Sequence, residues 1–396
     1  MQLTKKQEEG LRLAIARYKN KEKYTVIAGF AGSGKSTLIK FIVEALKNED
    51  DITDEDIVYT CFTGKACNVL IKKGLQNSFT LHKLLYESKP LANGQYLRLP
   101  KDYIDAKIVV VDEVSMAPKE LIDALFTYDV YVICCGDPGQ LPPISKNDDN
   151  HLLDHPHVFL DEIMRQAQES EIIRLTMDIR NGKSIPNSYD GKEVKIFPKK
   201  ELNSGMLLWA DQILTATNNT RININNTVRK LLNKPENPAN GDKVICLRNY
   251  WDDVNDNFDA LVNGTIGTLK NVKERVQYIP KKCDVSGIHK FNVIDAKFVD
   301  EFNSTYDTFN MDKQLFINGK NSLDWNTSYK LMKNKYRYII PYEFTYGYAI
   351  TCWKAQGSEW EKVLVIEENF PFDKEEHKKF LYTAITRASD KVVLIR

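Results

Sequence analysis

The strongest constraint on the fold of this 396-residue chain is a phosphate-loop motif close to its start. Residues 29–36 read Gly-Phe-Ala-Gly-Ser-Gly-Lys-Ser and match the pattern G-x-x-x-x-G-K-[ST] in full. The motif follows an apolar run at 24–28 and precedes a helical pattern at 38–46, which is the strand–loop–helix setting that the pattern requires. Backbone amides and the positive end of the helix bind phosphate in such a loop. We therefore predict a nucleoside triphosphate site; the alternative is a plain glycine-rich turn.

Two acidic residues complete the predicted chemistry. Lys35 is expected to reach the β and γ phosphates and Ser36 to bind Mg²⁺. The apolar run 109–111 ends in Asp112 and Glu113, and at the carboxyl edge of a parallel sheet this pair faces the phosphate loop. Asp112 would hold Mg²⁺, and Glu113 would orient and deprotonate an attacking water. The alternative is a pair of solvated acids that cap a strand. A water-activating glutamate favours hydrolysis over transfer to another acceptor.

Composition sets the class of protein. The chain is 42% hydrophobic and 28% charged, as in ordinary globular proteins, and it contains no apolar run near the ~20 residues of a membrane span. The N-terminus lacks the apolar core of a signal peptide, so a cytoplasmic location is expected. Seven scattered cysteines are expected to be reduced core thiols without a zinc site. Because the net charge is only +1, a nucleic-acid partner would need a local binding groove.

The pattern of strands and helices predicts two α/β regions, each interrupted once. Expected strands of the first are 24–28, 57–61, 108–111 and 130–134. Within it, Asn93-Gly94 lies between strand-type residues, which predicts a β-hairpin insertion, either functional or a plain surface hairpin. A helix is expected from Ser170 to Arg180. The second α/β pattern is split by a β-rich stretch at about 244–340, which predicts an inserted small barrel.

Further motifs follow the phosphate loop in a fixed order. They are Thr63-Gly64-Lys65-Ala66, Thr80-Leu81-His82, 136–143, 160–166, 351–359 and 382–388. Taken with Gln7 and the Asp112-Glu113 pair, this series resembles the motif series of superfamily-1 DNA helicases. The branch that it resembles most is the 5′ to 3′ branch (superfamily 1B), which includes the bacteriophage Dda helicase and bacterial RecD. The resemblance covers nearly the whole chain.

The resemblance implies an α/β fold with two RecA-like P-loop domains that contain parallel sheets. Residues 1–84 and 106–165 would form domain 1A, and 85–105 would form a β-hairpin pin inserted in it. Residues 166–243 and 341–396 would form domain 2A, and 244–340 an SH3-like β-barrel inserted in it.

The same resemblance assigns roles around ATP and Mg²⁺. Gln7 would read adenine, although Thr4 to Gln7 is also a helix capping box, and both roles can hold. Gln140 would sense the γ-phosphate, with Asp137 supporting its turn, and Arg165 and Arg387 would be arginine fingers, for which surface ion pairs are the alternative. The residues expected to contact the nucleotide are Gln7, Gly32, Ser33, Gly34, Lys35, Ser36, Thr37, Gln356 and Glu359.

Contacts with single-stranded DNA are implied in the same way. The expected residues are Thr63, Thr80, His82, Tyr96, Pro143, Thr351 and Trp353. Many relatives carry histidine where this chain has Trp353, so its indole either stacks on a base or belongs to the core. The segment Tyr329 to Tyr338 interleaves basic and aromatic residues, which fits a DNA-tracking surface or a half-exposed strand.

The predicted function is an ATP-dependent DNA helicase that translocates on single-stranded DNA, 5′ to 3′ by resemblance, and opens a DNA fork as a monomer. A replication partner or a single-stranded-DNA-binding protein is a further expected partner. One alternative is a translocase that displaces bound proteins without efficient unwinding. Another is a nucleotide-switched clamp without hydrolysis. A phosphotransferase lacks support, because no acceptor pocket is recognisable.

Overall fold

The computed structural model describes residues 3–90, 96–143, 149–162, 169–254, 260–368 and 373–396. The chain forms two compact units. Unit 1 consists of Met1–Tyr86, Pro100–Thr217 and Thr351–Arg396, and unit 2 of Glu87–Leu99 and Asn218–Ile350. Unit 1 contains all the motifs of the predicted nucleotide site.

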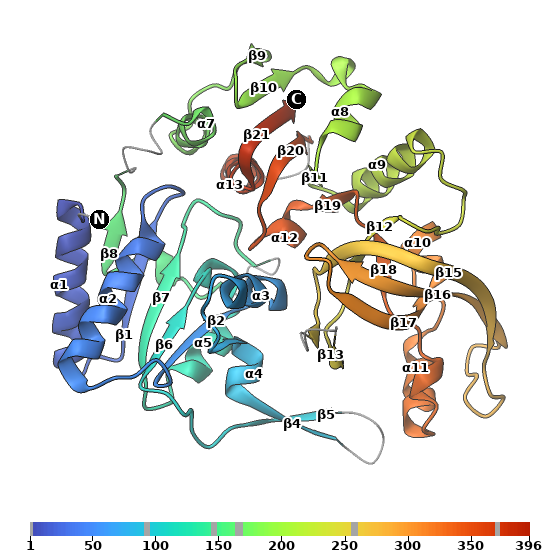
Figure 1. Cartoon of the computed structure of the whole chain (residues 1–396), viewed down its shortest axis with the longest axis horizontal. Helices are drawn as coiled ribbons and strands as arrows, with labels where there is room; N and C mark the ends of the chain where they lie inside the picture. Colours follow the sequence, from blue (N-terminus) through green and yellow to red (C-terminus); the bar gives the residue numbers. More distant parts are fainter. Residues whose placement is uncertain (1–2, 91–95, 144–148, 163–168, 255–259, 369–372) are drawn as a thin grey trace. The chain divides into compact units, whose positions relative to one another are not determined.

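The first sheet of unit 1 has six strands in the order β3-β2-β6-β7-β1-β8, all parallel (Figure 1). Parallel order places the carboxyl ends of the strands along one edge, where the connecting loops can build a site. The strands are β1 (Tyr24–Gly29), β2 (Ile57–Cys61), β3 (Ser78–Thr80), β6 (Ile108–Val111), β7 (Tyr131–Gly136) and β8 (Val158–Leu160). The helices are α1 (Lys5–Lys19), α2 (Lys35–Asp50), α3 (Gly64–Lys72), α4 (Leu81–Leu85) and α5 (Lys119–Leu125).

Alternating residues of these strands form two hydrophobic cores, one on each face of the sheet. Ile27 and Ile133 pack with α1 and α2 on one face. Val26 and Val132 pack with α4 and α5 on the other. Because a strand's side chains alternate between faces, continuous apolar strands must be covered on both sides. This doubly covered sheet holds the loops at its carboxyl edge in place.

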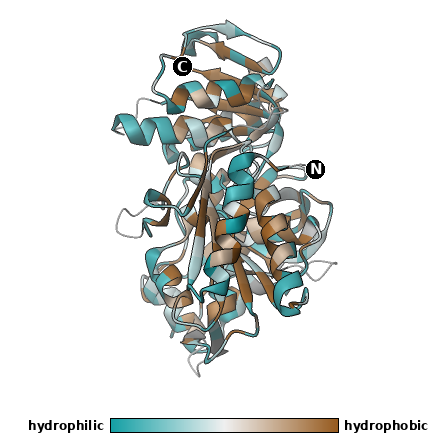
Figure 2. Cartoon of the chain, turned by 90° about the vertical axis from the view of Figure 1, so that its left-hand side faces the viewer, coloured by the Kyte–Doolittle hydropathy of each residue, from teal (hydrophilic) through white to brown (hydrophobic). Residues whose placement is uncertain are grey.

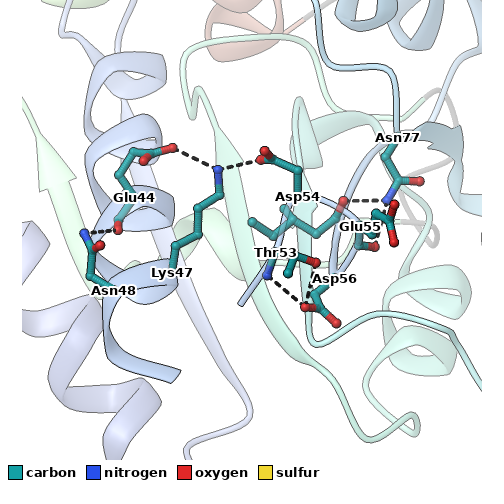
Figure 3. A network of polar contacts seen from close by, with 9 residues as sticks. Glu44, Lys47, Asn48, Thr53, Asp54, Glu55, Asp56 and Asn77 are labelled. Atoms are coloured by element: carbon teal, nitrogen blue, oxygen red, sulfur yellow. Dashed lines mark hydrogen bonds and ion pairs between the residues drawn. The ribbon is translucent and has the colours of Figure 1, made fainter. Parts of the chain in front are cut away.

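Polar contacts fix the connection from α2 to β2 (Figure 3). Lys47, near the end of α2, forms ion pairs with Glu44 and with Asp54 in the connecting loop. Asp56 accepts hydrogen bonds from both the amide and the hydroxyl of Thr53, and Asn77 donates to the carbonyl of Glu55. These exposed contacts each contribute little energy, but together they define the turn that follows the phosphate-loop helix.

The second sheet of unit 1 contains β11, β20, β21, β10 and β9 in that order. β11, β20, β21 and β10 are parallel, and β9 pairs antiparallel at the edge. The strands are β9 (Tyr189–Asp190), β10 (Val194–Phe197), β11 (Gln212–Thr215), β20 (Trp360–Ile366) and β21 (Ala388–Ile395), and β19 (Ala349–Thr351) spans the boundary between the units in the sequence. The helices are α7 (Glu171–Arg180), α8 (Ser204–Trp209), α12 (Cys352–Ala355) and α13 (Lys374–Ile385).

Unit 2 is built around a five-stranded sheet in the order β17-β16-β15-β12-β18, paired antiparallel throughout. A first core surrounds Phe298 and Phe344, and a second, smaller core surrounds Leu331. The strands are β4 (Tyr86–Pro90), β5 (Tyr96–Pro100), β12 (Lys243–Cys246), β13 (Tyr250–Val254), β14 (Ala260–Leu261), β15 (Ile266–Tyr278), β16 (Lys290–Asp300), β17 (Thr305–Asp312) and β18 (Phe344–Tyr346). The helices are α9 (Asn218–Leu231), α10 (Lys313–Ile317) and α11 (Trp325–Lys333).

Most expected elements are present, with small shifts. The fourth expected strand begins at Tyr131 instead of Val130 and runs on to Gly136, and α7 has Ser170 as its N-cap. β4 and β5 form a two-stranded sheet where the hairpin was expected, while the Asn93-Gly94 turn lies outside the described residues. The strand alternative for 329–338 is wrong, because this segment contains the end of α11 and a 3₁₀ turn at Arg337–Ile339.

Hydrophobic residues follow the strands, and hydrophilic residues lie on the outer sides of the helices (Figure 2). All seven cysteines are free and buried, as expected for core thiols. Within the described parts of the chain, no helix has both the length and the apolar character needed to cross a membrane.

Candidate nucleotide site

The phosphate loop joins β1 to α2 at the carboxyl edge of the first sheet. Gly32 and Gly34 have φ values of 75° and 81°, a region that glycine adopts without strain, and α2 begins directly at Lys35. The Lys35 ammonium donates to the carbonyl oxygens of Gly29 (2.7 Å) and Phe30 (3.1 Å), so it lies folded over the loop. Ser33 is buried with its Oγ unpaired, whereas Ser36 is exposed at the first turn of α2.

Gly29 is required by close packing. A Cβ at this position would lie 2.6 Å from Ser33 Oγ and 2.9 Å from the Cβ of Leu160 on β8. Any larger residue would therefore push the loop away from the sheet. The first glycine of the motif holds the loop close to the strands that carry the acidic residues.

Asp112 and Glu113 follow β6 at the same edge. Burial, together with repulsion from Glu113, raises the pKa of Asp112 to about 6, and the positive charge of Lys35 partly opposes this shift. Glu113 has a φ of 50°, an uncommon value for a residue other than glycine, which sets the direction of its side chain. Because ionisation of the buried Asp112 carboxyl is unfavourable, an added positive charge would stabilise its ionised form. Asp112 therefore suits a site that binds a cation.

The residues present fit Mg²⁺ bound with a nucleotide. Ser36 and Asp112 are the expected protein ligands, and Mg²⁺ typically takes only one or two protein oxygens and completes its shell with phosphate and water. Within the described residues, no group of three or more His, Cys, Asp or Glu side chains is arranged to hold a metal ion.

Gln140 joins the acidic residues to the turn after β7. Its Nε2 donates to Glu113 Oε1 at 3.5 Å, a long bond between the predicted sensor and the predicted base. The turn is held by Asp137, whose Oδ1 accepts the Gly139 amide at 2.9 Å. Desolvation raises the pKa of the buried Asp137 carboxyl above its usual range. The structure therefore brings Lys35, Asp112, Glu113 and Gln140 together, as the motifs predicted.

Tyr382, on α13 of the second sheet, links this turn to the phosphate loop. Its hydroxyl accepts the amide of Ala31 at 2.8 Å and donates to Asp137 Oδ2 at 2.7 Å. The ring is buried, and it also contacts the position where Gly139 would carry a Cβ. Tyr382 is the first residue of the motif at 382–388, but the sequence pattern predicted no role for it. No spacing rule signals a hydroxyl that bridges two loops so far apart in the chain.

Two more residues of the second sheet hold Leu141, immediately after Gln140. Thr383 Oγ1 accepts the Leu141 amide at 2.9 Å, and Gln356 Nε2 donates to its carbonyl at 2.8 Å. Gln356 was predicted to contact the nucleotide; in the structure its side-chain amide donates to the backbone next to the sensor turn, and the nucleotide contact stays a prediction. Together with Tyr382, these bonds tie the sensor turn to elements more than 200 positions later in the chain.

Of the two predicted arginine fingers, only Arg387 lies within the described residues. Arg387 is buried and donates to the carbonyls of Thr383 (3.2 Å) and Ser358 (3.3 Å), within its own part of the fold. Glu359 is exposed. Arg165 lies outside the described residues.

Gln7 fulfils the capping role and also reaches the phosphate loop. Thr4 and Gln7 form the predicted capping box at the start of α1. The Gln7 Nε2 donates to the carbonyl of Gly34 at 3.2 Å, and the side chain is 1% exposed. The capping role of Gln7 is confirmed, whereas the reading of adenine stays a prediction.

A cavity of ≈ 760 Å³ lies beside the phosphate loop, in the size range of small-molecule sites. Phe30, Gly139 and Tyr382 are on its wall, together with basic side chains of α7 and α13. The guanidinium of Arg180 lies 3.6 Å from the centroid of the Phe30 ring. The wall also includes Asp154 and Glu375, and Glu375 forms an ion pair with Lys378, so the charge of the cavity wall is mixed.

The predicted DNA contacts in unit 1 lie at loop and helix starts. Thr63 and Thr80 are N-caps whose Oγ1 atoms accept the amides of Ala66 (3.2 Å) and Lys83 (3.3 Å). Each hydroxyl keeps its own proton as a donor. Thr63 is half-buried, whereas Thr80 is 3% exposed, so a contact between Thr80 and DNA stays a prediction. Thr351 is the N-cap of α12, and its side chain makes no capping bond.

The remaining predicted contacts are less defined. His82, Pro143 and Trp353 are half-buried, and the His82 ring centroid lies 6.0 Å from that of Phe62. The side chain of Tyr96 lies outside the described residues.

A phosphate loop, a buried acidic pair and a sensor turn at the carboxyl edge of a parallel sheet define a P-loop NTPase with RecA-like domains. Comparison with known proteins narrows this class. A family model described as "AAA domain" matches residues 2–193, and one described as "UvrD-like helicase C-terminal domain" matches residues 346–395. An uncharacterised protein of Acanthamoeba polyphaga mimivirus is 26% identical over 493 residues, covering 98% of each chain.

Two further comparisons are with DNA helicases. The ATP-dependent DNA helicase Dda of Enterobacteria phage T4 is 27% identical over 210 residues, covering 49% of this chain but only 46% of Dda. A crystal structure of a Bacteroides Pif1 helicase with ADP-AlF3 and ssDNA aligns with 100% of this chain and 92% of its own, with a TM-score of 0.54. At 18% identity, that alignment establishes the fold alone. By these comparisons the chain is similar to DNA helicases of superfamily 1B.

Proposed function

We propose that this chain is an ATP-dependent helicase that translocates on single-stranded DNA, 5′ to 3′, and unwinds duplex DNA. The observation that carries the proposal is the set of bonds from the second sheet to the nucleotide site. Tyr382 bridges Ala31 and Asp137, and Gln356 and Thr383 hold Leu141. A site shared by two sheets converts the state of a nucleotide into movement of one sheet against the other.

The residues of the first sheet account for hydrolysis. Lys35 and the loop amides would bind the phosphates, and Mg²⁺, held by Ser36 and Asp112, would neutralise charge on the phosphate oxygens. Glu113 would orient the attacking water and accept its proton, while Gln140, in contact with Glu113, would report the γ-phosphate to the turn at Asp137. Arg165 and Arg387 would supply positive charge to the transition state.

DNA contacts would alternate between the two sheets during the cycle. Thr63, Thr80 and His82 follow strands of the first sheet, and Thr351 and Trp353 belong to the second. Donation from hydroxyl groups to phosphate gives binding without sequence preference, as a motor requires. The 85–105 hairpin would act as a strand-separating pin, and 244–340 as an SH3-like barrel. We place the protein in the cytoplasm, acting as a monomer on forks with or without a single-stranded-DNA-binding protein.

The test compares unwinding of duplexes with a 5′ tail and with a 3′ tail by the full chain and ATP. We expect displacement from the 5′-tailed duplex. Faster displacement from the 3′-tailed duplex would overturn the polarity, and ATP hydrolysis with no displacement from either would favour the protein-displacing translocase.

Lys35→Ala tests the site itself. Loss of a preorganised donor to the transferred group typically costs ~10²–10³ in rate, so DNA-stimulated ATP hydrolysis should fall at least about a hundredfold. Lys40→Ala, which removes an exposed lysine from the same helix, is the matched control and should retain activity. Unchanged hydrolysis in Lys35→Ala would contradict the assignment.

A further inference from the structure

The outer face of α11 in unit 2 carries an exposed tryptophan, stacked on a half-buried tyrosine, beside lysines. Trp325 is 71% exposed, and its ring stacks on Tyr329 with centroids 5.3 Å apart and planes 11° from parallel. Positions i and i+4 are neighbours on a helix surface, so Trp325, Tyr329 and Lys333 form one ridge. Large aromatic side chains are usually buried, and an exposed tryptophan stacked on a second ring is therefore informative.

This face is held by a rigid support. Thr327 and Leu331, on the inner side of α11, are fully buried in the smaller core of unit 2. Thr327 Oγ1 accepts the amide of Val285 at 3.3 Å, and the N-cap Asp324 accepts a hydrogen bond from Ser286. A support of this kind keeps the outer side chains in place, as a binding surface requires.

The charge around the ridge is positive. Residues 278–290 and 322–338, which pack together here, contain seven Lys or Arg and two Asp, whereas the net charge of the whole chain is +1. Both acids are occupied, because Asp324 caps α11 and Asp284 pairs with His289. Within the described residues, no acidic side chain forms an ion pair with Lys330 or Lys333.

The surface is also hollowed. A cavity of ≈ 480 Å³ lies between the 282–285 loop and α11, and its wall includes Tyr329 and the lysines at 282, 330 and 333. The Lys282 ammonium lies 5.0 Å from the centroid of the Tyr336 ring. Flat aromatic faces next to lysines, without acidic partners, match the two parts of a nucleic-acid strand: stacked bases and phosphates.

We propose that the outer face of α11 binds a single nucleic-acid strand, with a base stacked on the Trp325–Tyr329 pair and phosphates on Lys330 and Lys333. This site lies in unit 2, apart from the helicase motifs, which lie in unit 1. It would give the motor a second hold on DNA that does not depend on the nucleotide. The stacked aromatic rings favour a nucleic acid over an acidic protein segment, because flat bases stack on such rings and acidic side chains do not.

Photo-crosslinking tests the site directly. All seven native cysteines are buried, so Asn326→Cys, on the exposed side of α11, can be labelled selectively with a benzophenone. We expect the labelled protein to crosslink to a 5′-tailed oligo(dT) duplex. Lys320→Cys, exposed in the same unit, is the control position and should crosslink weakly. Equal yields at the two positions would overturn the proposal, and so would crosslinking to an added acidic peptide but not to DNA.

Substitutions then separate the two kinds of contact. Base stacking on an aromatic residue is worth roughly 5- to 150-fold in affinity per base, so Trp325→Ala should lower the crosslinking yield and weaken binding of the tail at least about fivefold, while Trp325→Phe should retain most of it. Lys330→Ala with Lys333→Ala should reduce the slope of log K against log salt by about 1.4. Lys199→Ala with Lys200→Ala, two exposed lysines of unit 1, should leave crosslinking at Asn326→Cys unchanged.

The outcome is independent of the proposed function. ATP hydrolysis stimulated by a short oligonucleotide should be unchanged in Trp325→Ala, because that residue lies outside the motor motifs. Normal hydrolysis with no crosslink at 326 overturns this inference alone. Failure of hydrolysis in the unsubstituted chain overturns the proposed function instead.

Discussion

The carboxyl edge of the first sheet and the outer face of α11 use similar groups in opposite ways. At the sheet edge, the Asp137 carboxylate is buried and accepts two hydrogen bonds, one of them from the buried hydroxyl of Tyr382. On α11, Trp325 and Lys333 are exposed and rest on a support that is itself complete. One region is organised around its own internal bonds, and the other presents groups to a partner.

The difference shows why the two regions respond differently to substitution. At the sheet edge the polar groups are hydrogen-bonded to one another. Removing one of them therefore leaves a buried partner without its hydrogen bond. The exposed side chains on the outer face of α11 do not hold other parts of the fold in place. Substitutions there should change binding while leaving stability and hydrolysis intact, whereas substitutions at the sheet edge should change hydrolysis first.

The largest expected effect comes from Glu113→Gln. Glutamine keeps the size and the contact with Gln140 but cannot accept the proton of water, and loss of a general base typically costs ~10²–10⁴ in rate. DNA-stimulated ATP hydrolysis, measured as phosphate release, should fall by about a thousandfold. Crosslinking of Asn326→Cys to DNA should stay unchanged in the same background. Glu120→Gln, an exposed glutamate on α5, is the matched control. If Glu113→Gln reduced crosslinking as strongly as hydrolysis, DNA binding at α11 would depend on the nucleotide site.

The sequence predicted the sheet edge well because its residues lie next to strand ends. A phosphate loop and an acidic pair are local patterns, and parallel strand order brings them together. The same reasoning gave Tyr382 no role, because its bonds to Ala31 and Asp137 join residues 351 and 245 positions apart. Such contacts depend on how α13 packs, and no local spacing encodes that.

The prediction was weaker in unit 2. The segment 329–338 was considered as a DNA-tracking surface or as a strand. Its basic and aromatic residues alternate in a way that suits both a strand and a helix, so periodicity could not decide between them. The Asp324 N-cap and the buried Leu331 show that α11 is a helix. Only the helix brings Trp325 onto Tyr329, and Trp325 lies outside the segment that the sequence singled out.

An intermediate effect is expected from Tyr382→Phe. The ring stays, but the Ala31 amide and the Asp137 carboxylate each lose a buried hydrogen-bond partner, which costs roughly 1–3 kcal/mol. If Tyr382 positions the sensor turn for hydrolysis, kcat should fall about tenfold while KM for ATP changes less than about twofold. The melting temperature should fall in either case, and a merely structural role would leave kcat unchanged. Tyr18→Phe, which removes a surface hydroxyl bonded to Asp50, is the control.

The smallest expected effect tests the support beneath the α11 surface. Asp324 caps α11 by accepting the Thr327 amide at 3.0 Å, and loss of such a cap typically costs ~1 kcal/mol. In Asp324→Ala, the α11 amides should exchange hydrogen about fivefold faster at pH 7, while Asp324→Asn should retain most of the protection. Trp325→Ala should leave hydrogen exchange of the α11 amides unchanged, because α11 does not depend on the Trp325 side chain for its stability. If Trp325→Ala destabilised α11 as much as Asp324→Ala, the aromatic pair would be part of the fold and not a surface for a partner.

The pH dependence of that protection gives the sharpest version of the same test. Hydrogen bonds from Ser286 and Thr327 hold the pKa of Asp324 well below its usual range. A carboxyl group with a lowered folded-state pKa stabilises the fold above its unfolded pKa of about 3.9, and this contribution is lost as the pH falls through the folded-state pKa. The difference in protection between the unsubstituted chain and Asp324→Ala should therefore be constant from pH 8 to about pH 5 and narrow below about pH 4. A difference that did not change with pH would mean that Asp324 stabilises α11 through its hydrogen bonds and that its charge contributes nothing.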